Sequence, residues 1–435
     1  MLNWSSLNDA QKRQALARPA ISNSEKLRNT VSVIISKVRN EGDNALLSYA
    51  KEFDKVNLTQ LKLTSVQIQQ QIDTLSDEVK AAIDLAYENI RAFHLAQYPK
   101  NIRLETKPGV VCEQKHAPIP RVGLYIPGGT APLPSTVLML GVCAQVAECP
   151  LPVICTPPNK QGLVAPEILY AANKCGISDV YLAGGAQAIA ALAFGTESIP
   201  KVDKIFGPGN SFVTEAKQQV SQTVEGAAID MPAGPSEVMV LADKDANPAF
   251  VASDLLSQAE HGVDSQAVLV SDSMVLIEQV QQEVESQLSQ LPRKEIAAAS
   301  IANSRYIFCD DLVSCITVVN EYAAEHLIAQ INSAENLVDK LANAGSIFVG
   351  PWSPESAGDY ASGTNHVLPT YGYARNYSSL GLLDFMRRFT VQTLSPTGIQ
   401  NIGPAIMRLA EAEGLDAHKK AVELRLQQLA KQGKA

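Results

Sequence analysis

Two Glu-His dipeptides carry side chains suited to chemistry in a chain of 435 residues that has only six histidines. They are Glu260-His261 and Glu325-His326. A segment rich in glycine and serine, 358–366, adds Asp359 and His366. Histidine suits proton transfer at neutral pH and binds borderline metals, and neighbouring carboxylates assist both roles. The clustering therefore favours a catalytic site over a purely structural protein.

The first pair closes a helix that we predict over 248–261. Asn247 is a suitable N-cap, and Gly262 is a suitable terminator. One polar stripe interrupts its otherwise apolar surface, formed by Asp254, Gln258 and His261. Gln258 and His261 leave the last turn toward the same side, as two ligands of one metal would. The alternative is that His261 only interacts with the dipole at the helix C-terminus.

The second pair lies where a predicted helix, 312–324, gives way to strand-like residues. Glu325 and His326 could converge there on a cleft, one group taking a proton and the other activating water. The alternative is an incidental pair at a solvated helix end. Asp359 and His366 lie in a predicted loop, and loops on a rigid scaffold often carry ligands, although Asp beside Gly can simply shape a turn.

His418 lies on the apolar stripe of a predicted C-terminal helix, 416–431. A histidine there is either a satisfied core residue or a residue presented to another subunit. Cysteine is absent from these stretches except as an apolar filler, so a thiol nucleophile is discounted. The available donors are imidazole, carboxylate and amide oxygen, a set that fits a catalytic zinc better than a closed thiolate site.

The overall composition is that of a globular enzyme, with 46% hydrophobic and 19% charged residues. The length predicts two or more domains. The net charge of −9, with no basic stripe, argues against a nucleic-acid partner. The N-terminus does not resemble a secretion signal, and no apolar run is long enough for a membrane span. Seven scattered cysteines without a CxxC fit reduced thiols, so we expect a cytoplasmic protein.

Four strand–turn–helix units follow one another between 121 and 220. The predicted strands are 121–126, 153–155, 179–183 and 204–206, and the helices after them are 135–147, 166–174, 186–194 and 211–220. This pattern predicts a doubly wound parallel sheet whose ligands lie beyond the carboxyl ends of the strands. Glycines fall at three of these ends, which favours close approach by a ligand, although glycine can merely punctuate a turn. No GxGxxG fingerprint is present, so a dinucleotide would be held in another way.

A second α/β stretch is predicted between 237 and 349, with strands at 237–241, 267–270 and 346–349. The first hundred residues are predicted to be helical, chiefly at 25–53 and 76–96. The chain from 382 onward is again predicted to be helical.

These segments together closely resemble the histidinol dehydrogenase family, over nearly the whole chain. The resemblance is carried by RVGLYIPGG (121–129), GGAQAIAALA (184–193), KIFGPGN (204–210), IDMPAGPSE (229–237), SQAEHG (257–262) and the 358–369 segment. It implies a zinc- and NAD-dependent four-electron oxidation of L-histidinol to L-histidine through a bound aldehyde.

The resemblance also implies an architecture. It is α/β, with two doubly wound, incomplete Rossmann-like sheet domains and helical N- and C-terminal tails that form a domain-swapped homodimer. The expected divisions are a discontinuous zinc and substrate domain (22–120 and 236–380), an NAD-associated domain (121–235) and dimerisation tails (1–21 and 381–435).

The resemblance assigns roles residue by residue. The implied zinc ligands are Gln258, His261, Asp359 and, from the partner chain, His418. His326 is the implied general base and Glu325 the group that activates water. The implied NAD contacts are Tyr125, Gln187 and Asn210. The implied substrate contacts are Ser236, His366 and Glu413, together with the zinc ligands and His326.

One departure from the family is visible: its usual Pro-Glu-His-Leu reads Ala324-Glu325-His326-Leu327 here. Alanine leaves the backbone before the pair less restricted than proline would. Three rival functions remain. They are a zinc hydrolase with Glu325 as base, an enzyme of the same fold that oxidises another amino or sulfonated alcohol, and a nucleotide-binding regulator without turnover.

Overall fold

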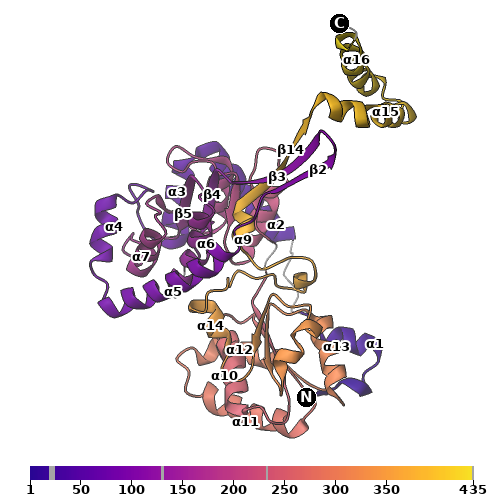
Figure 1. Ribbon diagram of the computed structural model, residues 1–435. Helices are drawn as coiled ribbons and strands as arrows, with labels where there is room; N and C mark the ends of the chain where they lie inside the picture. The colour runs from indigo at the N-terminus through magenta and orange to yellow at the C-terminus, as the bar shows by residue number, and fades with distance from the viewer. Residues whose placement is uncertain (19–24, 129–131, 232–233, 434–435) are drawn as a thin grey trace. The chain divides into compact units, whose positions relative to one another are not determined.

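The structure, a computed structural model, describes residues 1–18, 25–128, 132–231 and 234–433. The chain forms two compact units. Unit 1 comprises Met1–Gln97 and Ile119–Phe385, and unit 2 comprises Tyr98–Pro118 and Met386–Ala435. Unit 1 contains two parallel sheets, and unit 2 contains an antiparallel sheet and two helices (Figure 1).

The first sheet of unit 1 is the predicted doubly wound sheet. Its strands lie in the order β6 (Val180–Leu182), β5 (Leu151–Thr156), β4 (Arg121–Tyr125), β7 (Lys204–Phe206) and β8 (Ala228–Ile229). All four pairings are parallel. The helices between them are α6 (Pro134–Val146), α7 (Pro166–Lys174), α8 (Gly185–Phe194) and α9 (Ser211–Ser221). The order reverses between β4 and β7, which is where such sheets bind ligands.

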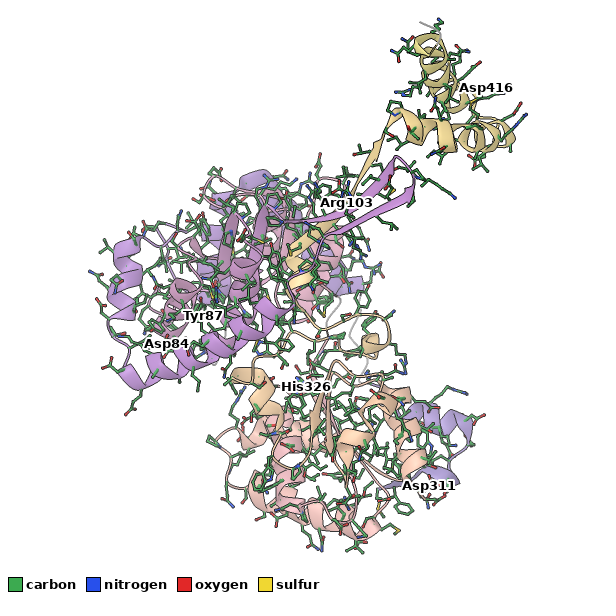
Figure 2. The ribbon with its side chains drawn as sticks, viewed as in Figure 1. Asp84, Tyr87, Arg103, Asp311, His326 and Asp416 are labelled. Carbon is green, nitrogen blue, oxygen red and sulfur yellow. The ribbon has the colours of Figure 1, made fainter. Side chains whose placement is uncertain are left out.

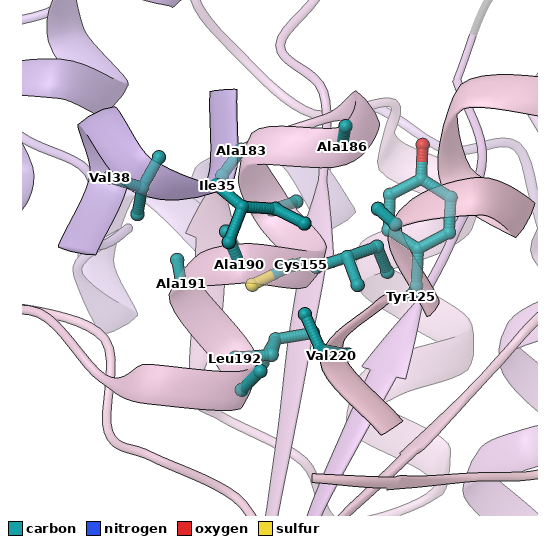
Figure 3. Close-up of a cluster of buried hydrophobic side chains, with 14 of the residues drawn as sticks. Ile35, Val38, Tyr125, Cys155, Ala183, Ala186, Ala190, Ala191, Leu192 and Val220 are labelled. Atoms are coloured by element: carbon teal, nitrogen blue, oxygen red, sulfur yellow. The ribbon is translucent and has the colours of Figure 1, made fainter. Parts of the chain in front are cut away.

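Helices from the first hundred residues cover this sheet's helical layers. α2 (Glu25–Glu41) packs on α8 and α9, and α5 (Asp77–Ala96) packs on α6 and α7. The remaining helical segments there are α3 (Asp43–Tyr49), η2 (Ala50–Asp54) and α4 (Ser65–Ile72). Figure 3 shows Ile35 and Val38 of α2 above the small residues Ala190 and Ala191 of α8. Alanines at this contact allow the two helices to approach closely, so the core is continuous from α2 to the sheet.

Apart from one added edge strand, the second sheet has the same relative strand order as the first. It runs β1 (Leu2–Asn3), β11 (Arg305–Phe308), β10 (Gln266–Ser271), β9 (Glu237–Ala242), β12 (His326–Gln330) and β13 (Ser346–Val349). All its pairings are parallel. Its helices are α10 (Pro248–Ala259), α11 (Met274–Leu288), α12 (Lys294–Ala302), α13 (Leu312–Tyr322) and the short α14 (Glu355–Tyr360). The reversal of order here falls between β9 and β12.

The beginning of the chain belongs to the second sheet. β1 pairs with β11, and two residues are buried in the core on that side: Trp4, and Ala15 at the end of α1 (Asp9–Ala15). The predicted domain boundaries group 1–21 with the C-terminal tail, and that grouping stays a prediction.

Unit 2 corrects the expectation of an entirely helical C-terminal portion. Met386–Leu394 forms β14, which pairs antiparallel with β3 (Val110–Pro118), and β3 pairs in turn with β2 (Ile102–Lys107). The alternation of Phe389 and Val391 with polar residues is typical of a strand. The predicted helices follow it as α15 (Pro396–Ala412) and α16 (Asp416–Gln432), which pack on each other.

Two further expectations can be compared with the structure. All seven cysteines are free, and six of them are buried. Among the helices of the described residues, none combines the length and apolar character needed to cross a bilayer.

Gly207, directly after β7, offers a test of the first sheet's ligand edge. Its φ of +122° is rarely adopted by other residues, and a Cβ there would overlap the carbonyl oxygen of Tyr125. We expect Gly207→Ala to lower the free energy of unfolding by at least about 3 kcal/mol, because backbone strain and a backbone clash add. The matched control is Gly350→Ala, where φ is +86° but nothing lies near the added carbon. It should cost only about 1 kcal/mol. Equal shifts of the two urea-unfolding midpoints would contradict the assigned geometry.

Candidate active site

The predicted catalytic pair lies at the amino ends of the second sheet's strands. His326 is the first residue of β12, and Glu237 is the first residue of the neighbouring β9. Figure 2 shows His326 at that end of the sheet. In parallel sheets, ligands usually lie beyond the carboxyl ends of the strands, but Glu325 and His326 lie at the amino ends. As in other parallel sheets, however, the pair lies where the strand order reverses.

The backbone of one residue orients both members of the pair. The N–H of Glu237 donates to Oε2 of Glu325 at 2.8 Å. The carbonyl oxygen of Glu237 lies 3.1 Å from Nδ1 of His326 and accepts its hydrogen. This bond leaves Nε2 of His326 directed to the other side of the ring, where no hydrogen-bond partner is found among the described residues.

Three carboxylates surround the imidazole of His326. Glu355 lies 3.5 Å and Glu325 3.8 Å from Nδ1, and Asp359 lies 3.6 Å from Nε2. The pair and Glu355 are almost completely buried. Buried carboxylates without a matching number of cations are costly, so this arrangement selects either bound protons or a bound cation.

The pKa values of these groups follow from that conflict. Burial raises the pKa of Glu325 and that of Glu355, each to about 8. Burial opposes the charge on His326, but Glu355, Glu325 and Asp359 outweigh it and raise its pKa to about 10. Burial also opposes the charge on Asp359, yet His326 lowers its pKa overall. Near neutral pH and without a metal, bound protons therefore neutralise part of the negative charge of this cluster.

Asp359 comes from a helix, which corrects the expectation of a loop. It lies near the end of α14, four residues after Glu355, so the two carboxylates share one face of that helix. Sequence reasoning missed Glu355. The signal was present, because Pro354 followed by an acidic residue is typical of a helix start and the i, i+4 spacing then pairs the carboxylates.

One group of side chains is arranged to hold a metal ion. His261, Glu355 and Asp359 each offer a ligand atom, and these atoms lie within 4.8 Å of one another. His261 follows the C-terminus of α10 and is exposed in the single chain. The surrounding protein atoms nevertheless partly remove water from its ring, and this desolvation lowers the pKa of His261. A lowered pKa favours the neutral imidazole that a metal requires.

Gln258 supports the same interpretation by its lack of partners. It lies in the last turn of α10 and is fully buried, yet neither atom of its amide has a hydrogen-bond partner among the described residues. An unpaired buried amide costs about 1–3 kcal/mol. A cation bound to Oε1 would remove the part of that cost that belongs to the oxygen. The donors are nitrogen and oxygen, and they therefore fit the predicted zinc.

His366 connects this cluster to the first sheet. Its Nδ1 donates to the backbone carbonyl oxygen of Asp359 at 2.9 Å, and its Nε2 lies 3.4 Å from Oγ1 of Thr136 in the first turn of α6. Burial lowers the pKa of His366. The ring therefore stays neutral between the two sheets. Ser236 directly precedes β9, and its carbonyl oxygen accepts from the N–H of Gln266.

The three predicted NAD contacts lie at the carboxyl ends of the first sheet. The hydroxyl oxygen of Tyr125, the last residue of β4, accepts from the N–H of Gly185 at 3.1 Å. Gln187 lies in the first turn of α8, and Asn210 caps α9 through bonds from the N–H groups of residues 212 and 213. Sequence reasoning missed the buried ion pair behind this edge. Lys217 and Asp230 bind each other, and both hold the backbone of Gly207.

The remaining two predicted residues belong to unit 2. Glu413 is the C-cap of α15, and His418 lies in the first turn of α16. Both are exposed. Unit 1 thus brings together the pair, Gln258, His261, Asp359 and His366.

Comparison with known proteins decides the family. The model of the histidinol dehydrogenase family matches residues 17–426. The chain belongs to the histidinol dehydrogenase family.

Individual members of the histidinol dehydrogenase family are similar to this chain over nearly the full length of both proteins. The chain is 56% identical to histidinol dehydrogenase of Pectobacterium atrosepticum over 99% of its own length and 97% of that protein. It is 55% identical to the Idiomarina loihiensis protein of the same name, over 97% and 96% of the two chains. The crystal structure of histidinol dehydrogenase from Elizabethkingia anophelis superposes with a TM-score of 0.95 at 50% identity, covering 99% of each chain. The α/β fold with two parallel sheets and C-terminal helices is therefore that of the family.

The unpaired amide of Gln258 leads to a test that does not require activity. In chelator-treated protein, Gln258→Leu should raise the free energy of unfolding by about 1 kcal/mol, because it replaces a desolvated amide by an apolar group of similar size. Gln330→Leu is the control. Its amide donates to buried Asp254 at 2.8 Å, so its loss should destabilise by about 1–3 kcal/mol. Urea unfolding measures both. Equal destabilisation by the two substitutions would show that Gln258 has a partner without metal.

Proposed function

We propose that this protein oxidises L-histidinol to L-histidine in the last step of histidine biosynthesis. One water and two NAD⁺ are consumed, two NADH and three protons are released, and L-histidinaldehyde stays bound between the two oxidations. The family membership carries this proposal, together with a buried Glu-His pair that one peptide orients beside nitrogen and oxygen donors. The proposal includes the domain division predicted from the sequence: a zinc and substrate domain (22–120 and 236–380), an NAD-associated domain (121–235) and dimerisation tails (1–21 and 381–435).

We assign the zinc site to Gln258, His261, Asp359 and the partner subunit's His418. The unpaired amide of Gln258 and the spacing of the His261 and Asp359 ligand atoms support this set. Glu355 lies in the same group, and its carboxylate adds negative charge that favours a divalent cation. A zinc ion bound there would hold the imidazole and amine of the substrate and so orient its carbinol.

The two oxidations would use the pair as follows. His326 accepts the proton of the substrate hydroxyl and later that of the hydrated aldehyde, through the Nε2 that its Nδ1 bond leaves available. A base must be neutral, and a divalent charge beside Asp359 offsets the carboxylates that raise the pKa of His326. Glu325 activates the water that adds to the aldehyde, and the N–H of Glu237 stabilises its carboxylate form.

The cofactor and the rest of the substrate would lie toward the first sheet. NAD binds at Tyr125, Gln187 and Asn210, beyond the carboxyl ends of β4, β6 and β7. The substrate contacts Ser236 and His366 in one chain, and Glu413 and His418 reach it from the partner. His418 is exposed on a helix with an apolar stripe, as a residue of an interface between two copies would be. The proposal therefore includes a domain-swapped dimer of identical chains.

The first test of the function is formation of NADH from L-histidinol. We expect the protein to form NADH, measured by its absorbance, when histidinol and NAD are added. Treatment of the protein with a strong chelator should abolish NADH formation, and added zinc should restore it. Other amino alcohols and a sulfonated alcohol serve as comparison substrates, and hydrolysis of amide substrates is measured in parallel. Full activity in zinc-free protein would refute the metal assignment. Turnover of another alcohol in place of histidinol would refute the substrate assignment.

A mixing experiment tests the contribution of the partner subunit. His261→Ala and His418→Ala should each be inactive alone, yet their co-refolded mixture should recover about a quarter of the native activity, because half of the dimers are hybrids with one intact site of two. A mixture of His261→Ala and Gln258→Ala is the control and should stay inactive, since both lesions lie on the same side of the site. Absence of recovery in the first mixture, with hybrids shown by native mass spectrometry, would place His418 in its own chain's site.

A further inference from the structure

Arg18, which the function above does not use, makes an unusually complete set of contacts behind the active site. Its Nε donates to Oε1 of Glu237 at 2.5 Å and its Nη2 to Oε2 at 2.9 Å. The same Nη2 donates to the backbone carbonyl oxygens of Tyr322 at 2.7 Å and Ala323 at 3.3 Å. The guanidinium lies 4.0 Å over the ring of Tyr322. The Arg18 side chain is 13% exposed and that of Glu237 2%.

The first route from Arg18 to the catalytic pair passes through Glu237. The carboxylate that Arg18 binds is fixed further by the N–H of Tyr371, which donates to Oε1 at 2.9 Å. The backbone N–H of Glu237 donates to Glu325, and the backbone carbonyl oxygen of Glu237 accepts from His326. A rotation of the Glu237 peptide would therefore displace both members of the pair at once.

The second route passes through the turn before the pair. α13 ends at Tyr322, and Ala323 adopts the left-handed region with φ +54° and ψ +65°, which is strained for a residue with a Cβ. Arg18 binds the carbonyl oxygens on both sides of this bend. Only Ala324 separates the bend from Glu325. This is also the place where the family's usual proline is replaced by alanine, so backbone restriction here depends more on contacts.

We propose that Arg18 is a positioning residue for the reaction: by binding the Glu237 carboxylate and capping α13, it holds Glu325 and His326 in their reactive orientation. This inference rests on the proposed function for its kinetic consequence. Arg18 touches neither member of the pair, and so it acts through Glu237 and the turn. A planar guanidinium is required because only it can bind two carboxylate oxygens and a carbonyl while stacking on a ring.

The experiment compares Arg18→Gln, Arg18→Lys and a control, Arg121→Gln, in the zinc-loaded protein. Arg121 forms a similar two-point pair with Asp203 at the start of β4, remote in the fold from the Glu-His pair. Arg18→Gln should lower kcat about 100-fold for both histidinol and histidinaldehyde, while KM and zinc content change little, because misplaced groups lose rate rather than binding. Arg18→Lys should retain about a tenth of the activity, since it keeps the charge but not the fork. Arg121→Gln should stay within about twofold of the native rate.

A second measurement does not depend on any activity. In chelator-treated, ¹⁵N-histidine-labelled protein, the His326 signal, assigned with His326→Gln, should show a hydrogen-bonded Nδ1–H. That signature should be lost in Arg18→Gln and kept in Arg121→Gln.

An unchanged His326 signal in Arg18→Gln, or an equal fall in kcat and rise in KM with loss of zinc, would overturn the proposal. Lack of histidinol oxidation by the native chain would instead refute the proposed function, and the spectrum would still decide the role of Arg18. If Arg18→Gln does not fold, the same spectrum of Arg18→Lys decides it, and an unaltered signal there with an unaltered rate counts against the proposal.

Discussion

The imidazole of His326, buried among three carboxylates, is the constraint on which the rest of the active site depends. Glu325, Glu355 and Asp359 all lie within 4 Å of its ring nitrogens. One imidazolium cannot balance three buried carboxylates. The desolvation of each unbalanced ion costs roughly several kcal/mol of folding free energy. Bound protons meet this cost when no metal is present. A divalent cation would meet this cost and would free His326 to act as a base, so in the proposed mechanism substrate binding and proton transfer share one electrostatic cause.

The two parallel sheets supply this site from opposite edges. The first offers the carboxyl ends of its strands, with Tyr125 and the glycine turn after β7. The second offers the amino ends of β9 and β12, where one peptide joins the catalytic pair. His366 lies between them, held by Asp359 and close to Thr136 of α6. In the proposed mechanism, the first sheet would therefore hold the cofactor and the second would carry out proton transfer on the same substrate, although the two sheets share one strand order apart from the added β1.

The parts of the fold that the sequence predicted well are those whose local signals agree. β7 (Lys204–Phe206), α7 (Pro166–Lys174) and β13 (Ser346–Val349) were predicted to the residue, because apolar runs there end at glycine, proline or a cap. β14 was wrongly assigned to a helix, since it is exposed on most of its length and its strand signal is only an alternation around Phe389 and Val391. The site was harder, because glycine and serine around Asp359 concealed α14 and with it Glu355. No local pattern connects Arg18 to Glu237, 219 positions later, so only folding reveals that ion pair.

The position of the zinc ion can be measured by anomalous diffraction at the zinc absorption edge, from crystals of the zinc-loaded protein. We expect one peak per active site, at coordination distance from Gln258 Oε1, a ring nitrogen of His261, a carboxylate oxygen of Asp359 and a ring nitrogen of the partner subunit's His418. A peak that leaves the Gln258 amide without a ligand role, or the absence of zinc from the carboxylate cluster around His326, would contradict the proposed zinc site.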